Sequence, residues 1–230
     1  MDLPISNGTW EKLSEANQQA AWARKGIFAT AVGSAYIIGG PKSILYVGKS
    51  AGPRADRVST GQSQADLSAD QKEWMENWKA NNPRSEFWKL INGVVDTKEI
   101  AWTNVSKMDE IDKKTNRPTT PRAKNFASIS MISIKVLMEE IKFLQPKLII
   151  FATSDFAKKY IEEIPAYLNF DIYDSRKIDG THRSSPFVTD IVTYKSKTDS
   201  QFLLHTSHPQ DKSQNILSAI TETARNILAL

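Results

Sequence analysis

The stretch Ser-Ile-Leu-Tyr-Val-Gly-Lys-Ser-Ala-Gly-Pro, residues 43–53, decides the fold. Its first half is a continuous apolar run, and such runs are typical of strands that are buried on both faces, as in parallel sheets. Its second half carries Gly48 and Gly52, and glycines directly after a strand let the backbone turn sharply and approach a ligand closely. The stretch therefore predicts a central strand that ends at a binding turn. A plain tight connection from strand to helix is the alternative.

Similar apolar runs recur along the chain and are separated by helical patterns. We expect strands at residues 100–105, 147–152 and 202–205, and further strands near 170–173 and 187–194. Helical spacing of apolar residues marks 9–25, 68–80, 85–95, 126–144, 154–163 and 213–228. Strands that alternate with helices predict an α/β fold, a three-layer α/β/α sandwich around a central, largely parallel sheet of four or five strands. We expect one domain over residues 1–230, with residues 1–34 as a helical extension packed on it.

The composition excludes several kinds of chemistry. The chain has 230 residues with 30 Lys and Arg, 26 Asp and Glu, three histidines and no cysteine. The lack of cysteine excludes disulfides, iron–sulfur clusters, Cys-ligated zinc and thiol nucleophiles, and we expect neither a metal nor a cofactor. The start of the chain has no secretory pattern, and no apolar run approaches about 18 residues, so we expect a cytoplasmic protein with no membrane partner. The net charge of +4 is compatible with a nucleic-acid partner.

Three segments follow predicted strands, and ligands of open α/β sheets bind at the carboxyl ends of the strands. These segments are residues 48–53, 104–107 and 208–212. The amide of Asn104 offers both a donor and an acceptor, so it can read the edge of a base, although a turn asparagine is the alternative. The basic residues after it are interpreted as contacts to DNA phosphates or, alternatively, as a solvated loop; they are Lys107, Lys113, Lys114 and Arg117.

The third segment contains the pair His208-Pro209. Proline fixes the turn after the strand, and the helix that follows directs the positive end of its dipole to the same place. His208 is therefore a candidate functional histidine. His205 lies inside the predicted strand and is expected to be a packed core residue.

Together and in this order, these segments resemble the uracil-DNA glycosylase superfamily, nearest to the plan of its type 4 and 5 branches. The matching pieces are SILYVGKSAGP (43–53), EFWKLINGVV (86–95), WTNVSK (102–107) with NRPTTP (116–121), QPKLIIFATSDFAKKYI (145–161) and LLHTSHPQ (203–210). They correspond to the family's strand and glycine turn, its F-W-x-x-L, its T-N-x-V-K with a basic proline-rich loop, its R-P-K strand and its H-P-S-P. The resemblance covers roughly residues 43–220.

The resemblance implies a glycosylase that flips a nucleotide out of DNA and hydrolyses its N-glycosidic bond without a metal. It places His208 where the family's histidine donates a hydrogen bond to the departing base, and Asn104 at the base edge. Lys212 falls near the family's wedge position, where a side chain fills the space that the flipped base leaves in the stack, or binds phosphate. DNA is the expected partner of a monomer. The residues expected against the substrate are Gly48, Ala51, Gly52, Asn104, Pro209 and Lys212.

The chain departs from the family pattern in the first motif. That motif often carries an acidic residue or an asparagine that positions the attacking water, whereas Lys49 and Ser50 stand there in this chain. Asp56 could supply a carboxylate if its loop folds back. An attack of Lys49 on the sugar carbon, through a Schiff base, is an alternative. The catalytic candidates are His208, Ser50, Lys49 and Asp56.

The family also places an aromatic ring after its first motif, and residues 54–66 contain none. Other rings could replace it, namely Tyr46, Trp74, Trp78 and Trp88. A pocket without the usual ring could admit a base bulkier than uracil. This leads to the hypothesis that the target is a modified base, as in phage DNA, and that the protein is defensive. The cysteines that hold an iron–sulfur cluster in the type 4 and 5 branches are missing, so no cluster is expected.

Two other functions stay open. Ala35-Tyr36-Ile37 followed by Tyr46-Val47-Gly48, with Arg57 downstream, resembles the core of a GIY-YIG nuclease. That chemistry needs two tyrosines near the phosphate, an arginine and a metal-binding glutamate. The second alternative is a DNA-binding protein that keeps the glycosylase fold without the activity, and Lys49 in place of an acid is the feature that supports it.

Overall fold

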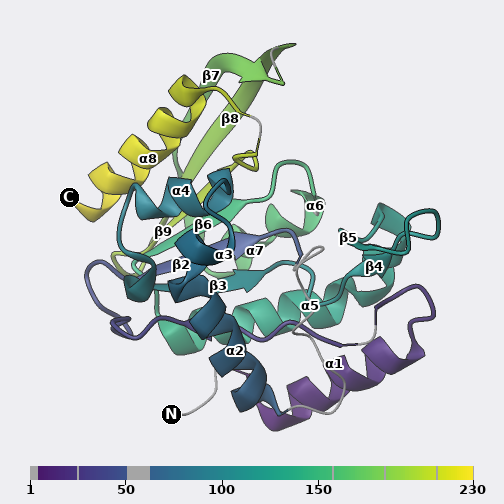
Figure 1. Ribbon diagram of the computed structural model, residues 1–230. Coiled ribbons are helices and arrows are strands. Elements are labelled where there is room, and N and C mark those ends of the chain that lie inside the picture. The colour runs from purple at the N-terminus through teal and green to yellow at the C-terminus, as the bar shows by residue number, and fades with distance from the viewer. Residues whose placement is uncertain are drawn as a thin grey trace.

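A seven-stranded mixed sheet forms the centre of the molecule (Figure 1). The structure is a computed structural model that describes residues 5–24, 26–50, 63–156, 158–183, 185–210 and 212–229. The strand order is β1-β3-β2-β6-β9-β8-β7. The expected α/β class is confirmed, and the expectation of four or five strands is wrong because antiparallel strands extend the sheet at both edges.

The four central strands are parallel and correspond to the four apolar runs. Their bounds are β2 (Ile44–Gly48), β3 (Ile100–Asn104), β6 (Leu148–Ala152) and β9 (Phe202–Thr206). Nearly all of their residues are buried, because helices cover both faces of the sheet and neither face meets water. The register pairs Gly48 with Asn104 at the carboxyl ends of β2 and β3.

The antiparallel strands at the edges were harder to predict. β1 (Ala31–Val32) pairs with β3, so part of residues 1–34 belongs to the central sheet and is more than a helical extension. At the other edge, β7 (Phe170–His182) and β8 (Ser185–Ser196) form a hairpin. β8 contains the strand expected near 187–194, whereas β7 is far longer than the strand expected near 170–173. Most of β7 is exposed and polar, and therefore it lacks the apolar pattern that marks a buried strand.

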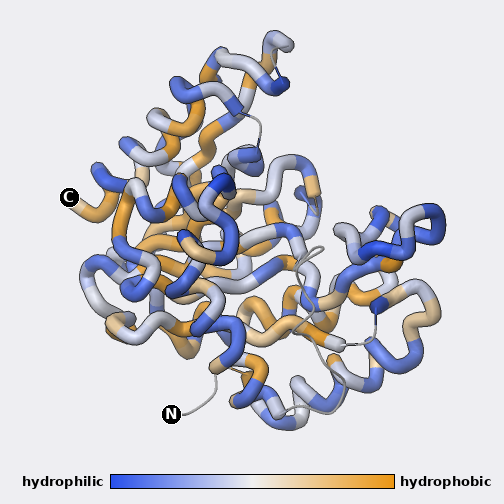
Figure 2. The backbone as a smooth tube through the Cα atoms, in the orientation of Figure 1, coloured by the Kyte–Doolittle hydropathy of each residue, from blue (hydrophilic) through white to orange (hydrophobic). Residues whose placement is uncertain are grey.

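Helices cover the two faces of the sheet and make the expected three layers. One core cluster packs alternate strand residues such as Ile44, Tyr46 and Ile150 against α2 (Gln64–Glu76), α3 (Trp78–Asn81), α4 (Glu86–Asn92) and α8 (Gln214–Leu228). The other cluster packs Leu45, Val47 and their neighbours against α1 (Asn7–Gln19), α5 (Ala123–Leu144), α6 (Lys158–Ile161) and α7 (Ile164–Tyr167). Figure 2 shows the hydrophobic residues gathered along the strands and on the inner faces of the helices.

Several shorter elements differ from the sequence-based expectations. The helix expected over 9–25 ends at Gln19, and the one expected over 154–163 is reduced to α6. The segment that carries the basic residues Lys113, Lys114 and Arg117 contains the small hairpin of β4 (Glu110–Ile111) and β5 (Pro118–Thr119). A short 3-10 helix, η2 (Thr97–Glu99), precedes β3.

Candidate functional site

The ends of β2 and β3 lie side by side and join two of the three predicted segments. The backbone N–H of Val105 donates to the carbonyl of Gly48, and that of Ser106 donates to the carbonyl of Lys49, both at 2.9 Å. A Cβ atom on Gly48 would lie 2.5 Å from Oδ1 of Asn104 and 3.4 Å from the ring of Phe87. Only glycine leaves room for the Asn104 amide at this point.

The Asn104 side chain is almost completely buried, with 1% of its surface exposed. Within the described part of the chain its Nδ2 has no hydrogen-bond partner. Leaving such a buried donor unpaired costs about 1–3 kcal/mol. A ligand with an acceptor atom, such as the carbonyl oxygen of a base, would pair this donor and remove the cost.

Phe87, at the start of α4, is the functional candidate that the sequence analysis missed. Its ring stacks on Tyr46, with centroids 4.2 Å apart, and lies nearly parallel to the imidazole of His208, with centroids 5.8 Å apart and a 21° angle between the planes. The Tyr46 hydroxyl donates to the Phe87 carbonyl at 2.9 Å and fixes this position. Phe87 therefore connects the third predicted segment to Gly48. The Phe-Trp pair is a signal that could have found it. Neighbouring residues of a helix point in different directions, so when Trp88 is buried in the core, Phe87 points elsewhere.

His208 lies half-buried on the loop between β9 and α8, and backbone contacts orient it. Its own N–H donates to Oγ of Ser154 at 2.8 Å. The N–H of Gln210 donates to Nδ1 of the imidazole at 3.3 Å. Because Nδ1 accepts this bond, the proton of the neutral ring is on Nε2. Nε2 is then a hydrogen-bond donor, which is the form needed to stabilise negative charge on a leaving group.

Lys49 and Ser50 follow Gly48 at the same edge, and both are half-buried. Burial lowers the pKa of Lys49, and the negative charge of Asp155 partly opposes that shift. Oγ of Ser50 is 3.2 Å from Oγ1 of Thr120, a contact that brings the basic loop to the site. The predicted residues Ala51, Gly52 and Asp56 lie outside the described residues.

Lys107 corrects one prediction. Instead of facing DNA phosphate, its side chain is fully buried, and its Nζ is 2.7 Å from Oε1 of Glu140 on α5. Thr103 donates to the other carboxylate oxygen at 3.0 Å, and Thr30 also donates to Glu140. A buried carboxylate requires a positive partner, and the Lys107 ammonium, which also donates to the Thr103 hydroxyl, supplies it. Sequence patterns could not show this because Glu140 lies 33 residues away.

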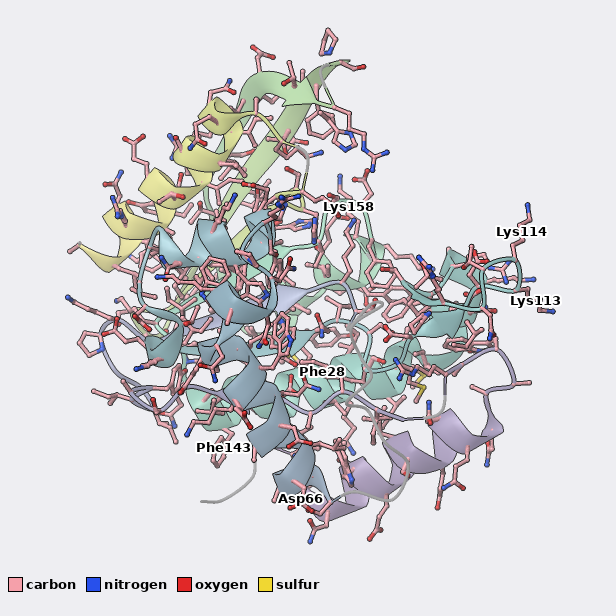
Figure 3. All side chains as sticks on the ribbon, in the orientation of Figure 1. Phe28, Asp66, Lys113, Lys114, Phe143 and Lys158 are labelled. Carbon is pink, nitrogen blue, oxygen red and sulfur yellow. The ribbon has the colours of Figure 1, made fainter. Side chains whose placement is uncertain are left out.

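The other basic candidates remain exposed. Lys113, Lys114 and Arg117 lie in the turn between β4 and β5, and Figure 3 shows Lys113 and Lys114 pointing away from the body of the molecule. The carboxylate of Asp112 accepts the N–H groups of Lys114 and Thr115, at 2.8 and 2.9 Å, and shapes this turn. A contact between these cations and phosphate stays a prediction.

The remaining residues of the third segment have different surroundings. His205 is buried as expected, with 9% of its surface exposed, and its Nε2 is 3.4 Å from Oγ1 of Thr153. Pro209 is buried beside His208. Lys212 contacts the hairpin, where its Nζ lies 3.7 Å from the centre of the Phe187 ring on β8. Its role as a wedge stays a prediction.

The geometry does not fit the nuclease alternative. Tyr46 packs within the core on the α4 side of the sheet, whereas Tyr36 packs with the core on the α5 side, where its hydroxyl donates to the Leu144 carbonyl. Two tyrosines on opposite faces cannot contact the same phosphate. Arg57 lies outside the described residues.

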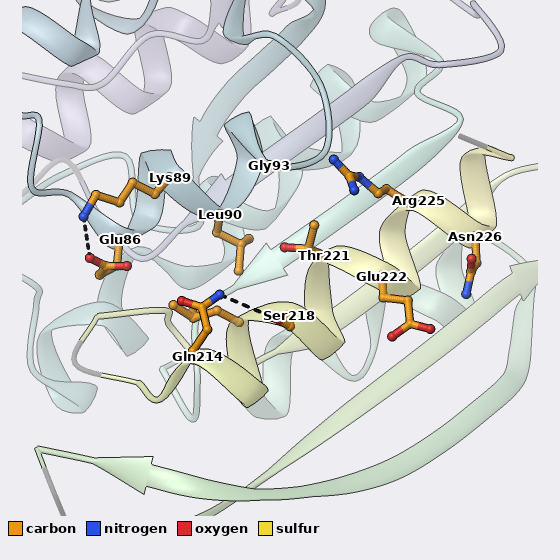
Figure 4. A pocket seen from close by; sticks show the side chains of 11 residues that line it. Glu86, Lys89, Leu90, Gly93, Gln214, Ser218, Thr221, Glu222, Arg225 and Asn226 are labelled. Atoms are coloured by element: carbon orange, nitrogen blue, oxygen red, sulfur yellow. Dashed lines mark hydrogen bonds and ion pairs between the residues drawn. The ribbon is translucent and has the colours of Figure 1, made fainter.

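One cavity of the structure is lined by α4 and α8. Figure 4 shows the cavity between α4 and α8, which has a volume of about 510 Å³ and is lined by Lys89, Thr221, Arg225 and their neighbours. None of the predicted site residues lines it. Within the described ranges, no three His, Asp or Glu side chains gather as a metal site would require, and no helix has the length and apolar character to cross a membrane.

The fold and the site together define an α/β protein with a polar and aromatic site at the carboxyl edge of its parallel strands. Comparison with known proteins adds no identity to this description. The sequence matches no protein-family model and no curated protein.

Proposed function

We propose that this protein is a DNA glycosylase that flips a base out of DNA and hydrolyses its N-glycosidic bond. The observation that carries the proposal is the grouping of Gly48, Asn104, Phe87 and His208 at one edge of the sheet. These residues come from four separate segments, and each has a property that the reaction needs.

Recognition of the flipped base is assigned to Asn104 and Phe87. The unpaired Nδ2 of Asn104 would donate to a carbonyl oxygen on the base edge. The Phe87 ring would supply an aromatic surface for stacking, and base–aromatic stacking contributes about 1–3 kcal/mol. This contribution is comparable with the few kcal/mol that extrusion of a nucleotide costs.

Cleavage is assigned to His208. Breaking the bond between C1′ and the base nitrogen leaves positive charge on the sugar and negative charge on the base. The N–H at Nε2 of His208 would donate to the base as this negative charge develops. Water then adds its hydroxyl to C1′, and its remaining proton balances the charge of the released base.

The base itself is part of the proposal. The hypothesis of a bulkier, phage-derived base began from the missing ring in residues 54–66. Phe87 now provides a ring from α4, so a pyrimidine of ordinary size such as uracil is equally suited to the site.

The test is mass spectrometry of bases released from matched oligonucleotides. The panel contains uracil, hypoxanthine and phage-modified bases, each in single-stranded and duplex DNA, with unmodified DNA of the same sequence as the control. Release of one base class without added metal supports the proposal. Release of uracil alone removes the phage-base hypothesis.

A DNA-binding protein without activity is the second candidate. Lys49 supports it, because this lysine stands where the family resemblance places an acid or an asparagine, and the water-activating group is not assigned. Tight binding of the oligonucleotides with no release of any base would favour this function.

A further inference from the structure

The hairpin of β7 and β8 extends beyond the rest of the sheet, and the proposed function does not use it. In β8 only Val192–Lys195 pair with β9, whereas the strand continues to pair with β7 as far as Ser185. Within the described residues, the outer half of β8 therefore has β7 on one side and no strand on the other, and Figure 1 shows the hairpin reaching past α8.

Cationic and aromatic side chains gather at the end of this hairpin. We call His182, Arg183, Phe187 and Lys212 the hairpin tip. The ring of Phe187 is close to two other side chains of the tip, with Lys212 Nζ 3.7 Å and the His182 ring 5.7 Å from its centre. Residues 180–189 contain no Asp or Glu. This combination of charge and ring matches a phosphate backbone with adjacent bases.

The end of β7 is hydrogen-bonded directly to the loop that carries His208 and Lys212. The N–H of Ser213 donates to the Thr181 carbonyl, and the Thr181 N–H donates to Oγ of Ser213, both at 2.9 Å. His182 and Lys212 form an isolated β-bridge. Lys212 is the fourth residue after His208, so their Cα atoms are at most about 14 Å apart. At 3.4 Å per base along a strand, this is a span of about four bases.

We propose that the hairpin tip is a second DNA-binding element, which holds the strand next to the flipped nucleotide. Arg183 and Lys212 contact phosphates, and the exposed part of the partly buried Phe187 ring, together with His182, contacts a base within about four positions of the target. This inference rests on the proposed function, because it takes the nucleotide at His208 as its reference point.

The experiment measures DNA affinity without requiring any chemistry. Oligonucleotides carry a tetrahydrofuran abasic analogue at the target position, and fluorescence anisotropy gives the dissociation constant over a salt series. The test variants are Arg183→Glu and Phe187→Ala. The matched control is Lys195→Glu, an equal charge change on the same hairpin at the end that joins the sheet. Thermal melts of each variant, and the milder substitution Arg183→Gln, show whether a loss of affinity comes from a folding defect.

We expect Arg183→Glu to weaken binding about tenfold and to reduce the slope of log K against log salt by about one. Phe187→Ala weakens binding about tenfold with the slope unchanged. Shortening the DNA from six to two nucleotides on one flank lowers the affinity of the wild type and has less effect on the tip variants, because the lost nucleotides are those that the tip holds.

Two results would overturn the inference: tip variants that bind as the wild type does, or an equal loss in Lys195→Glu. Base release, measured separately, distinguishes the two proposals. If the wild type releases no base while the tip variants lose affinity, the glycosylase function fails and the DNA-binding tip stands. If bases are released and the tip variants bind normally, only the tip is wrong.

Discussion

Replacing Lys107 by methionine should destabilise the protein without removing a DNA contact. The side chains of Lys107 and Glu140 are both fully buried and 2.7 Å apart. Methionine keeps most of the volume and leaves the carboxylate of Glu140 with the Thr30 and Thr103 hydroxyls only. Removing one partner of a buried ion pair costs about 3–5 kcal/mol. For a chain of this size, each kcal/mol lowers Tm by about 2–4 °C, so the expected loss is roughly 6 to 20 °C.

The assay compares thermal melts and DNA affinities of three proteins: wild type, Lys107→Met, and Lys107→Met combined with Glu140→Leu. The double variant should regain much of the lost Tm, because no buried charge is then left unpaired. The exposed Lys113→Met is the control and should leave Tm unchanged. An unchanged Tm in Lys107→Met, together with weaker DNA binding, would refute the buried pair and restore the phosphate contact.

Three further predictions concern the site. Gly48→Ala should lower base release at least tenfold with little change in Tm, because the new Cβ would lie 2.5 Å from the Asn104 amide oxygen. The control is Gly8→Ala, where a new Cβ would meet nothing within 4 Å and base release should be unchanged. Borohydride should trap no covalent complex with DNA if hydrolysis is direct, whereas a trapped complex that disappears in Lys49→Ala would show the Schiff-base route. Burial lowers the pKa of His205 below its usual 6.5. As the pH falls below about 6.5, the unfolded state therefore binds more protons than the folded state, and the folded protein loses stability. His205→Asn should lose less Tm than the wild type between pH 7.5 and 5.5, and an equal loss would contradict this assignment.

The central strands could be predicted because their signal is local. The four apolar runs fill positions covered on both faces by helices, so each run appears in the sequence without interruption. The rule that ligands bind at the carboxyl ends of strands then selected Gly48, Asn104 and His208. The structure relates these three residues through the Gly48–Asn104 register and the ring of Phe87.

What could not be predicted depends on partners far away in the sequence. In the sequence, Lys107 looks like one more cation of a basic loop. Only the fold shows that it is buried and paired with Glu140 on α5. Phe87 looks like one more apolar residue of a helix until the fold places it against His208. The length of β7 and β8 comes from pairing with each other, and exposed polar strands leave no apolar period in the sequence.

The central claim is that the imidazole of His208 donates a hydrogen bond to the departing base. It is tested most directly by the single-turnover rate of base release by His208→Ala, measured with saturating enzyme on the substrate that the panel identifies. We expect His208→Ala to release the base about 10²–10³ times more slowly than the wild type, with DNA affinity unchanged. A His208→Ala variant that binds DNA and releases the base at the wild-type rate would contradict it.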